Sequence, residues 1–209
     1  MRRIHGGARL ASDVANLGYE ARRALAAEAE RRIAARGAEL VPNRSSLFSS
    51  IGTTTEEVAR ALVGHDDLPV VTNNVHVVAI LLPVPGIELA VAGGSVHKAD
   101  GGMVGEAAVQ LVCRYRLDYA VIEASAIDLD GTLLDFEERE VDVARAVVAH
   151  AGRVVLVADA TEFARSAPLK ITGLERVRTF VTDRPPPAAS LAFRSCEIDA
   201  RVARAGGTR

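Results

Sequence analysis

Several features are scarce in this 209-residue chain, and their scarcity excludes whole classes of protein. There are two cysteines, Cys113 and Cys196, too few for a disulfide framework, so both thiols are predicted to be reduced packing residues in a cytoplasmic protein. No apolar run approaches the roughly 18 residues of a membrane span, and the first residues lack the apolar core of a secretion signal. We therefore expect neither secretion nor a membrane anchor.

A marked excess of charge of either sign is also lacking. The chain has 25 Lys and Arg residues against 27 Asp and Glu residues, a net charge of -2. Proteins that bind nucleic acid over a broad surface are usually basic, so any DNA contact must be local. Apolar residues, in contrast, make up 49% of the chain, which at this length is enough for one well-buried core.

The segment from Leu47 to Val63 carries the clearest local signal. An apolar run, the residues Gly52-Thr53-Thr54-Thr55 and a stretch of apolar residues at helical spacing predict a strand, a tight turn and a helix. Gly52 can take backbone angles closed to other residues, and the threonines place hydroxyls and unpaired amides at the positive end of the helix dipole. Such a helix start attracts phosphate, whereas the alternative is that a threonine only caps the helix.

Strand and helix patterns alternate along the rest of the chain. A helix is predicted from Tyr19 to Arg36, with Gly37 as its stop. The further predicted strands span residues 68–72, 87–92, 119–124, 153–158 and 179–182, and the further predicted helices span residues 75–82, 106–115 and 137–150. This alternation implies parallel pairing and right-handed crossovers, and therefore a three-layer α/β fold with an open, mostly parallel sheet.

In such a sheet, ligands bind at the carboxyl ends of the strands. The turns at Gly52, Asn73, Gly93 and Ser125 each follow a predicted strand, so they should converge on one crevice.

In their order and spacing, these motifs resemble the C-terminal sensor domain of the DeoR/GlpR family of bacterial transcription regulators. The resemblance runs from about Arg2 to Asp183. It rests on Arg2 to Ala8, Gly52 to Thr55, Val71-Thr72-Asn73, Gly93-Gly94 with Val104-Gly105, Ile127-Asp128, Ala158-Asp159, Phe163 with Arg165-Ser166, and Thr182-Asp183.

The resemblance implies a fold of the ribose-5-phosphate isomerase and CoA-transferase type that senses a sugar phosphate, forms a homo-oligomer and has no enzymatic activity. Residues 1–18 would be the linker from a missing N-terminal winged helix-turn-helix, residues 19–200 the effector-sensing domain, and residues 201–209 a flexible basic tail. DNA would be bound only through the missing domain, so we expect this chain not to bind operator DNA. No cofactor, metal or catalytic residue is expected.

The predicted phosphate or effector site combines the strand-end turns with nearby basic residues. It consists of Gly52, Thr53, Thr54, Thr55, Asn73, Gly93, Gly94, His97, Lys98 and Arg165, with Lys170 as a further source of positive charge.

At four places the chain departs from the pattern that the resemblance implies. Members usually carry an acidic residue at the position of Ser50 and an Asp-Gly pair at the position of Ser125-Ala126. They also carry a lysine near Ala144 and a lysine at the position of Glu162. Two missing charged partners weaken phosphate binding by roughly 10² to 10⁴, so we expect a degenerate pocket.

Two enzymatic alternatives remain open at this stage. The string from Ala126 to Asp135 resembles the first motif of haloacid-dehalogenase-type phosphatases, in which Asp128 would be the nucleophile and Asp130 the acid/base, with a magnesium ion beside the phosphate. Against this, Lys170 is the only lysine in the 74 residues that follow the string. The second alternative is an isomerase on the same fold, which would need carboxylate and lysine groups poised for proton transfer.

Overall fold

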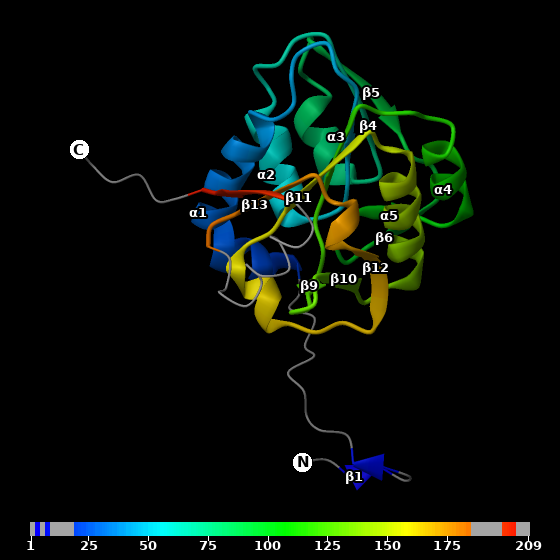
Figure 1. Cartoon of the computed structure of the whole chain (residues 1–209). Helices are drawn as coiled ribbons and strands as arrows, with labels where there is room; N and C mark the ends of the chain where they lie inside the picture. Colours follow the sequence, from blue (N-terminus) through cyan, green and yellow to red (C-terminus); the bar gives the residue numbers. More distant parts are fainter. Residues whose placement is uncertain (1–2, 5–6, 9–18, 185–197, 204–209) are drawn as a thin grey trace, which may run out of the picture.

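The fold is built on a seven-stranded sheet in which every neighbouring pair of strands is parallel. The computed structural model describes residues 3–4, 7–8, 19–184 and 198–203, with side-chain surroundings from residue 27 onward. The strand order is β14-β13-β11-β8-β3-β4-β5 (Figure 1). These strands are β3 (Leu47–Ser49), β4 (Leu68–Thr72), β5 (Ile87–Val91), β8 (Tyr119–Ile122), β11 (Arg153–Val157), β13 (Thr179–Thr182) and β14 (Asp199–Val202).

Helices cover both faces of this sheet, as Figure 1 shows. One face carries α1 (Tyr19–Ala38), α2 (Thr53–Ala61) and α3 (Val75–Leu81), and the other carries α4 (Glu106–Val112) and α5 (Glu138–His150). The strand order grows from β3 toward β5 and then resumes at β8 on the opposite side of β3. Because crossovers between parallel strands are right-handed, this reversal places the later helices on the other face.

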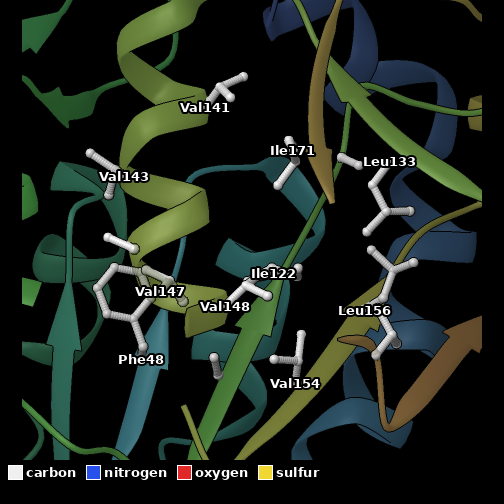
Figure 2. Close-up of a cluster of buried hydrophobic side chains, with 14 of the residues drawn as sticks. Phe48, Ile122, Leu133, Val141, Val143, Val147, Val148, Val154, Leu156 and Ile171 are labelled. Carbon is white, nitrogen blue, oxygen red and sulfur yellow. The ribbon is translucent and has the colours of Figure 1, made fainter. Parts of the chain in front are cut away.

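Alternate residues of each central strand face opposite layers. Leu47 and Val121 pack with the α1–α3 layer, while Phe48 and Ile122 pack with the α4–α5 layer. Figure 2 shows the second core, where Val147 of α5 lies beside Phe48. Both faces of these strands are apolar because both are covered, which explains their nearly continuous hydrophobic runs.

Short antiparallel strands surround the carboxyl edge of the main sheet. One hairpin joins β6 (Ser95–His97) to β7 (Gly102–Val104), and a three-stranded sheet has the order β12-β10-β9. Its strands are β9 (Ala126–Ile127), β10 (Thr132–Asp135) and β12 (Leu169–Gly173), and the single-turn helices η1 (Ala160–Ala164) and η2 (Leu174–Arg176) flank β12. The sequence analysis missed these strands because segments of two to five residues show little periodicity.

Several predicted boundaries need correction. The first helix continues through Gly37 to Ala38. The glycine lets the helix lie close to the sheet, since a Cβ at Gly37 would be 3.3 Å from Val157 Cγ1. The helix predicted to end at Tyr115 ends at Val112. Cys113, which follows it, is exposed rather than packed.

The two ends of the chain are described only in part. Within the predicted linker, β1 (Arg3–Ile4) and β2 (Gly7–Ala8) form an antiparallel pair, and the remainder of residues 1–18 lies outside the described residues. Arg201 and Val202, predicted to belong to a flexible tail, lie in β14 and pair with β13; residues 204–209 and Cys196 lie outside the described part. No helix within the described ranges combines the length and apolarity needed to cross a membrane.

Candidate functional site

A pocket lies where the strand order reverses, between the carboxyl ends of β3 and β8. The space free of protein atoms is about 310 Å³, a figure that includes space open to solvent. Its lining residues come from the ends of β3, β4 and β8 and from β10 and α5: Phe48, Ser50, Ile51, Asn73, Glu123, Asp135, Glu140, Val143, Ala144 and Val147. A reversal of strand order is where open α/β sheets bind ligands. The structure brings the turn after β3, at Ser50 and Ile51, and the turn at Asn73 to one pocket, whereas Gly52, Gly93 and Ser125, which the sequence also predicts to converge there, are not among its lining residues.

The predicted phosphate position at the start of α2 is occupied by a carboxylate of the chain itself. Glu123 Oε2 accepts a hydrogen bond from the Thr54 amide at 3.0 Å. Gly52 permits this approach, because it has a φ of 139° and a Cβ there would lie 2.1 Å from Glu123 Oε2. The carboxylate thus satisfies an amide at the positive end of the helix, which is the role predicted for a phosphate.

The threonine hydroxyls of this turn face inward. Thr53 Oγ1 donates to Glu30 Oε1 at 2.6 Å, and Thr55 Oγ1 lies within hydrogen-bond distance of the backbone oxygens of Ser50 and Gly52. All three threonines are buried. Thr53 and Thr55 therefore hold the turn in place, and a ligand would have to meet the backbone rather than these hydroxyls.

Further buried carboxylates gather around the start of α2. We call Glu30, Glu123 and Glu162 the α2 cluster. Burial raises the pKa of Glu30 to about 7, with a smaller contribution from Asp159, although the Thr53 hydroxyl opposes the shift. Burial, followed by the charges of Glu123 and Asp159, raises the pKa of Glu162 well above its usual range. The resemblance implies a lysine at the position of Glu162, but this residue is a buried acid.

Asn73 anchors the β6–β7 hairpin beside the pocket. Its Nδ2 donates to the Met103 carbonyl at 3.2 Å, and the Met103 amide donates to the Asn73 carbonyl at 2.6 Å. Its Oδ1 is buried and has no hydrogen-bond partner among the described residues. Gly93 and Gly94 follow β5 and lead into β6, but neither lines the pocket.

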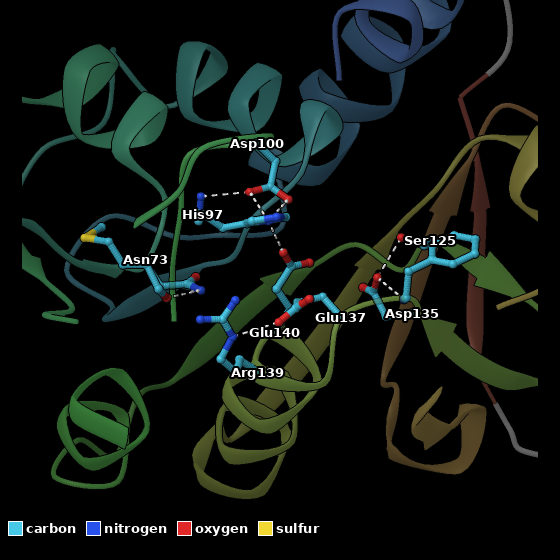
Figure 3. Close-up of polar contacts among 11 residues, drawn as sticks. Asn73, His97, Asp100, Ser125, Asp135, Glu137, Arg139 and Glu140 are labelled. Atoms are coloured by element: carbon cyan, nitrogen blue, oxygen red, sulfur yellow. Dashed lines mark hydrogen bonds and ion pairs between the residues drawn. The ribbon is translucent and has the colours of Figure 1, made fainter. Parts of the chain in front are cut away.

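Of the basic residues predicted to compensate for lost lysines, His97 approaches the pocket. Its Nδ1 lies 2.8 Å from Oε1 of Glu140, which lines the pocket, and 3.2 Å from Asp100 Oδ1 (Figure 3). Lys98 is exposed, and Arg165 Nη2 donates to Thr161 Oγ1. Lys170 is exposed in β12. We call His97, Asp100 and Glu140 the α5 cluster.

The sequence analysis missed the acidic residues of the crevice. Burial, followed by the charges of Asp100 and Asp135, raises the pKa of Glu140 to about 9. Asp135 Oδ1 accepts a hydrogen bond from Ser125 Oγ at 2.9 Å. Glu123 could have been predicted, because it directly follows the strand Tyr119–Ile122. Asp135 and Glu140 could not, because β10 and α5 bring them to the pocket only through tertiary packing.

Asp128 and Asp130 form a hairpin turn rather than a catalytic pair. They lie between β9 and β10, outside the main sheet. The Asp128 carbonyl accepts from the Gly131 amide at 2.9 Å, and Asp130 Oδ1 accepts from the Thr132 amide at 2.8 Å. This backbone contact lowers the pKa of Asp130. The phosphatase alternative is therefore not favoured.

Known proteins similar to this chain agree with a regulatory role. The family model of the DeoR C-terminal sensor domain matches residues 25–184. A glycerol-3-phosphate regulon repressor from Escherichia coli strain K12 is 40% identical over 187 residues, which cover 90% of this chain and 74% of the repressor. The match to a sensor domain and to a named repressor confirms the prediction that the chain is not an enzyme.

Solved structures with low sequence identity share the fold. The translation initiation factor eIF-2B of Pyrococcus horikoshii OT3 has a TM-score of 0.53 at 19% identity, covering 77% of this chain and 64% of that one. The open parallel α/β sheet is confirmed. By its sequence and its sheet, the chain belongs to the DeoR family and contains that family's C-terminal sensor domain.

Proposed function

We propose that this domain binds a phosphorylated small metabolite in the crevice between β3 and β8, and that binding controls a DNA-binding domain of a cytoplasmic repressor. The observation that carries this proposal is the pocket at the reversal of strand order, which lies beside the start of α2. The name of the glycerol-3-phosphate regulon repressor, 40% identical, supports a small phosphorylated compound as the effector.

Glu123 opposes this binding in its present position. Its carboxylate accepts the Thr54 amide and adds a negative charge where a phosphate would have to lie. The resemblance implies a lysine near Ala144 and another at the position of Glu162 to reinforce phosphate binding. This chain has no positive charge at either residue. An effector must therefore displace Glu123 from the helix start, which supports the prediction of weak binding.

The test compares two variants by calorimetric titration with glycerol 3-phosphate and ribose 5-phosphate. In Glu123→Ala the Thr54 amide becomes available, and a hydrogen bond to a charged group contributes about 1.5 to 3 kcal/mol. Phosphate affinity should therefore rise about 10- to 100-fold over the unmodified chain. Glu57→Gln is the matched control, because it removes a charge from the same helix where Glu57 pairs with Arg60.

Two results would count against the proposal as stated. If neither the unmodified chain nor Glu123→Ala binds any sugar phosphate, the crevice is not an effector site for this class. If the unmodified chain already binds at micromolar concentration and Glu123→Ala changes nothing, the effector lies elsewhere in the domain and the helix start is not its phosphate site.

We further propose that the domain forms a homo-oligomer. Large apolar side chains are exposed just beyond the ends of two neighbouring helices: Val63, after α2, is 51% exposed, and Leu82, after α3, is 73% exposed. Contiguous exposed apolar surface is typical of contacts between subunits, so these two side chains are the candidates for such a contact. Sedimentation equilibrium of the full chain tests this, and a monomer at all concentrations would contradict it.

A further inference from the structure

The α5 cluster brings three potential metal ligands together from separate parts of the chain. His97 ends β6, Asp100 lies in the turn that leads to β7, and Glu140 lies in the first turn of α5. One ligand atom from each residue lies within 4.8 Å of the others. His97 Nδ1 is 2.8 Å from Glu140 Oε1 and 3.2 Å from Asp100 Oδ1.

The two separations from His97 Nδ1 are close to what a bound cation requires. With metal–nitrogen and metal–oxygen bonds of about 2.0 to 2.2 Å, neighbouring donor atoms lie about 2.9 to 3.5 Å apart. A metal ion could replace the hydrogen that His97 now shares with the carboxylates, and the side chains would need to move little.

The two carboxylates of the cluster are largely buried. The Asp100 and Glu140 side chains are only 11% and 12% exposed. Within residues 27–184, no lysine or arginine forms an ion pair with Asp100 or Glu140. Arg139, on the same helix as Glu140, pairs with Glu137 instead, at 2.8 Å (Figure 3). Asp135 adds a further negative charge facing Glu140. Two carboxylates therefore contact one imidazole.

An independent observation at the same pocket also points to a cation. Asn73 is 2% exposed, and its Oδ1 has no hydrogen-bond partner among the described residues. The amide orientation is fixed, since Nδ2 donates to the Met103 carbonyl. Asn73 and Glu140 line the same pocket, and both are labelled in Figure 3. A buried amide oxygen needs a donor or a cation to face it.

We propose that His97, Asp100 and Glu140 bind a divalent first-row transition metal ion at the edge of this pocket. One imidazole and two carboxylates favour ions such as Mn²⁺, Co²⁺ or Zn²⁺ over Mg²⁺, which takes oxygen ligands and keeps its water. Three protein ligands leave coordination positions open toward the pocket and Asn73. This site does not depend on the sugar-phosphate proposal, because the metal ion alone is the ligand.

The experiment titrates the metal-free full chain with Co²⁺ and Mn²⁺, followed by calorimetry and visible absorption. One equivalent should bind, and Mg²⁺ should bind at least about tenfold more weakly. Absence of thiolate-to-cobalt charge-transfer absorption separates this site from the exposed Cys113. His97→Ala and Glu140→Gln should each weaken binding by about tenfold or more, with unchanged circular dichroism.

Glu137→Gln is the control, because Glu137 lies one turn away and pairs with Arg139; it should leave affinity within about twofold. The proposal is overturned if no transition metal binds, or if His97→Ala and Glu140→Gln both fold and bind as tightly as the unmodified chain. Equal loss in Glu137→Gln would also overturn it, since the effect would then be one of general charge.

Discussion

The crevice contains two groups of carboxylates that the chain stabilises in different ways. In the α2 cluster, neutral donors approach the acids: the Thr54 amide reaches Glu123 and the Thr53 hydroxyl reaches Glu30. In the α5 cluster, an imidazole lies between two carboxylates at the edge of the pocket. The first group is enclosed by helix and sheet, whereas His97 is 32% exposed. Both groups lie near a helix start, since Glu140 is in the first turn of α5; the donor is a helix amide in the α2 cluster and an imidazole in the α5 cluster.

This difference bears on the proposed effector site. An anion at the start of α2 has to replace Glu123, while the opposite side of the same pocket presents oxygen atoms. The two halves of the crevice therefore favour ligands of opposite charge. Three substitutions test how firmly each half is built, in order of decreasing expected effect.

The largest effect on stability is expected from Gly52→Val, which should destabilise the start of α2. Its side chain would meet the Glu123 carboxylate at a backbone φ of 139°, so both overpacking and backbone strain oppose it. Each effect costs about 1 to 3 kcal/mol, giving a loss of about 2 to 6 kcal/mol in the free energy of unfolding by urea titration. Gly64→Ala is the control, because a Cβ at Gly64 meets nothing within 4 Å. Equal losses in both variants would show that the Glu123 contact is not what requires glycine.

A smaller, pH-dependent effect is expected from Glu30→Gln. Burial raises the folded-state pKa of Glu30 from 4.5 to about 7, so the folded chain holds a proton that the unfolded chain has released between these pH values. The unmodified chain therefore loses stability as pH rises from 4.5 through 7. Glutamine cannot ionise and keeps an acceptor for Thr53, so the variant should be more stable by about 1 to 3 kcal/mol at pH 8.

At pH 4.5 and below, the stability advantage of Glu30→Gln should shrink toward zero, because glutamate is then protonated in both states. Chemical denaturation of both chains at pH 4.5 and pH 8 measures the difference. Glu28→Gln serves as the control on the same helix, since the Glu28 side chain is 81% exposed. A stability gap that does not grow with pH would contradict the burial of Glu30 as its cause.

The smallest effect is expected from Ser125→Ala, on the α5 side. It removes the hydroxyl that donates to Asp135 at 2.9 Å, but Asp135 still accepts the Phe136 amide. The free energy of unfolding should fall by about 1 kcal/mol. Ser45→Ala, which removes a hydrogen bond within an exposed turn, should change it by less than about 0.5 kcal/mol. A loss of several kcal/mol in Ser125→Ala would mean that this side of the crevice is as tightly constrained as the α2 side.

The sequence by itself was sufficient to predict the parallel framework. The strands at 68–72 and 179–182 have their predicted bounds, because apolar β-branched runs bounded by turn residues encode local structure directly. The family also followed from sequence, and so did the approach of the Asn73 turn to the end of β3, since parallel strands bring their carboxyl ends to one edge; Gly93 and Ser125, predicted to join them, do not line the pocket.

Only the tertiary structure decided which charges occupy the crevice. Glu123 and Thr54 are 69 positions apart, and His97 and Glu140 are 43 apart, so no local pattern links them. The short strands β6 and β7 form one local hairpin and β9 and β10 another, and β10 also pairs with the distant strand β12. The sequence encodes a helix start that attracts anions; long-range packing decides that Glu123 lies there, because a side chain tethered nearby meets the amide at a far higher local concentration than a free ligand.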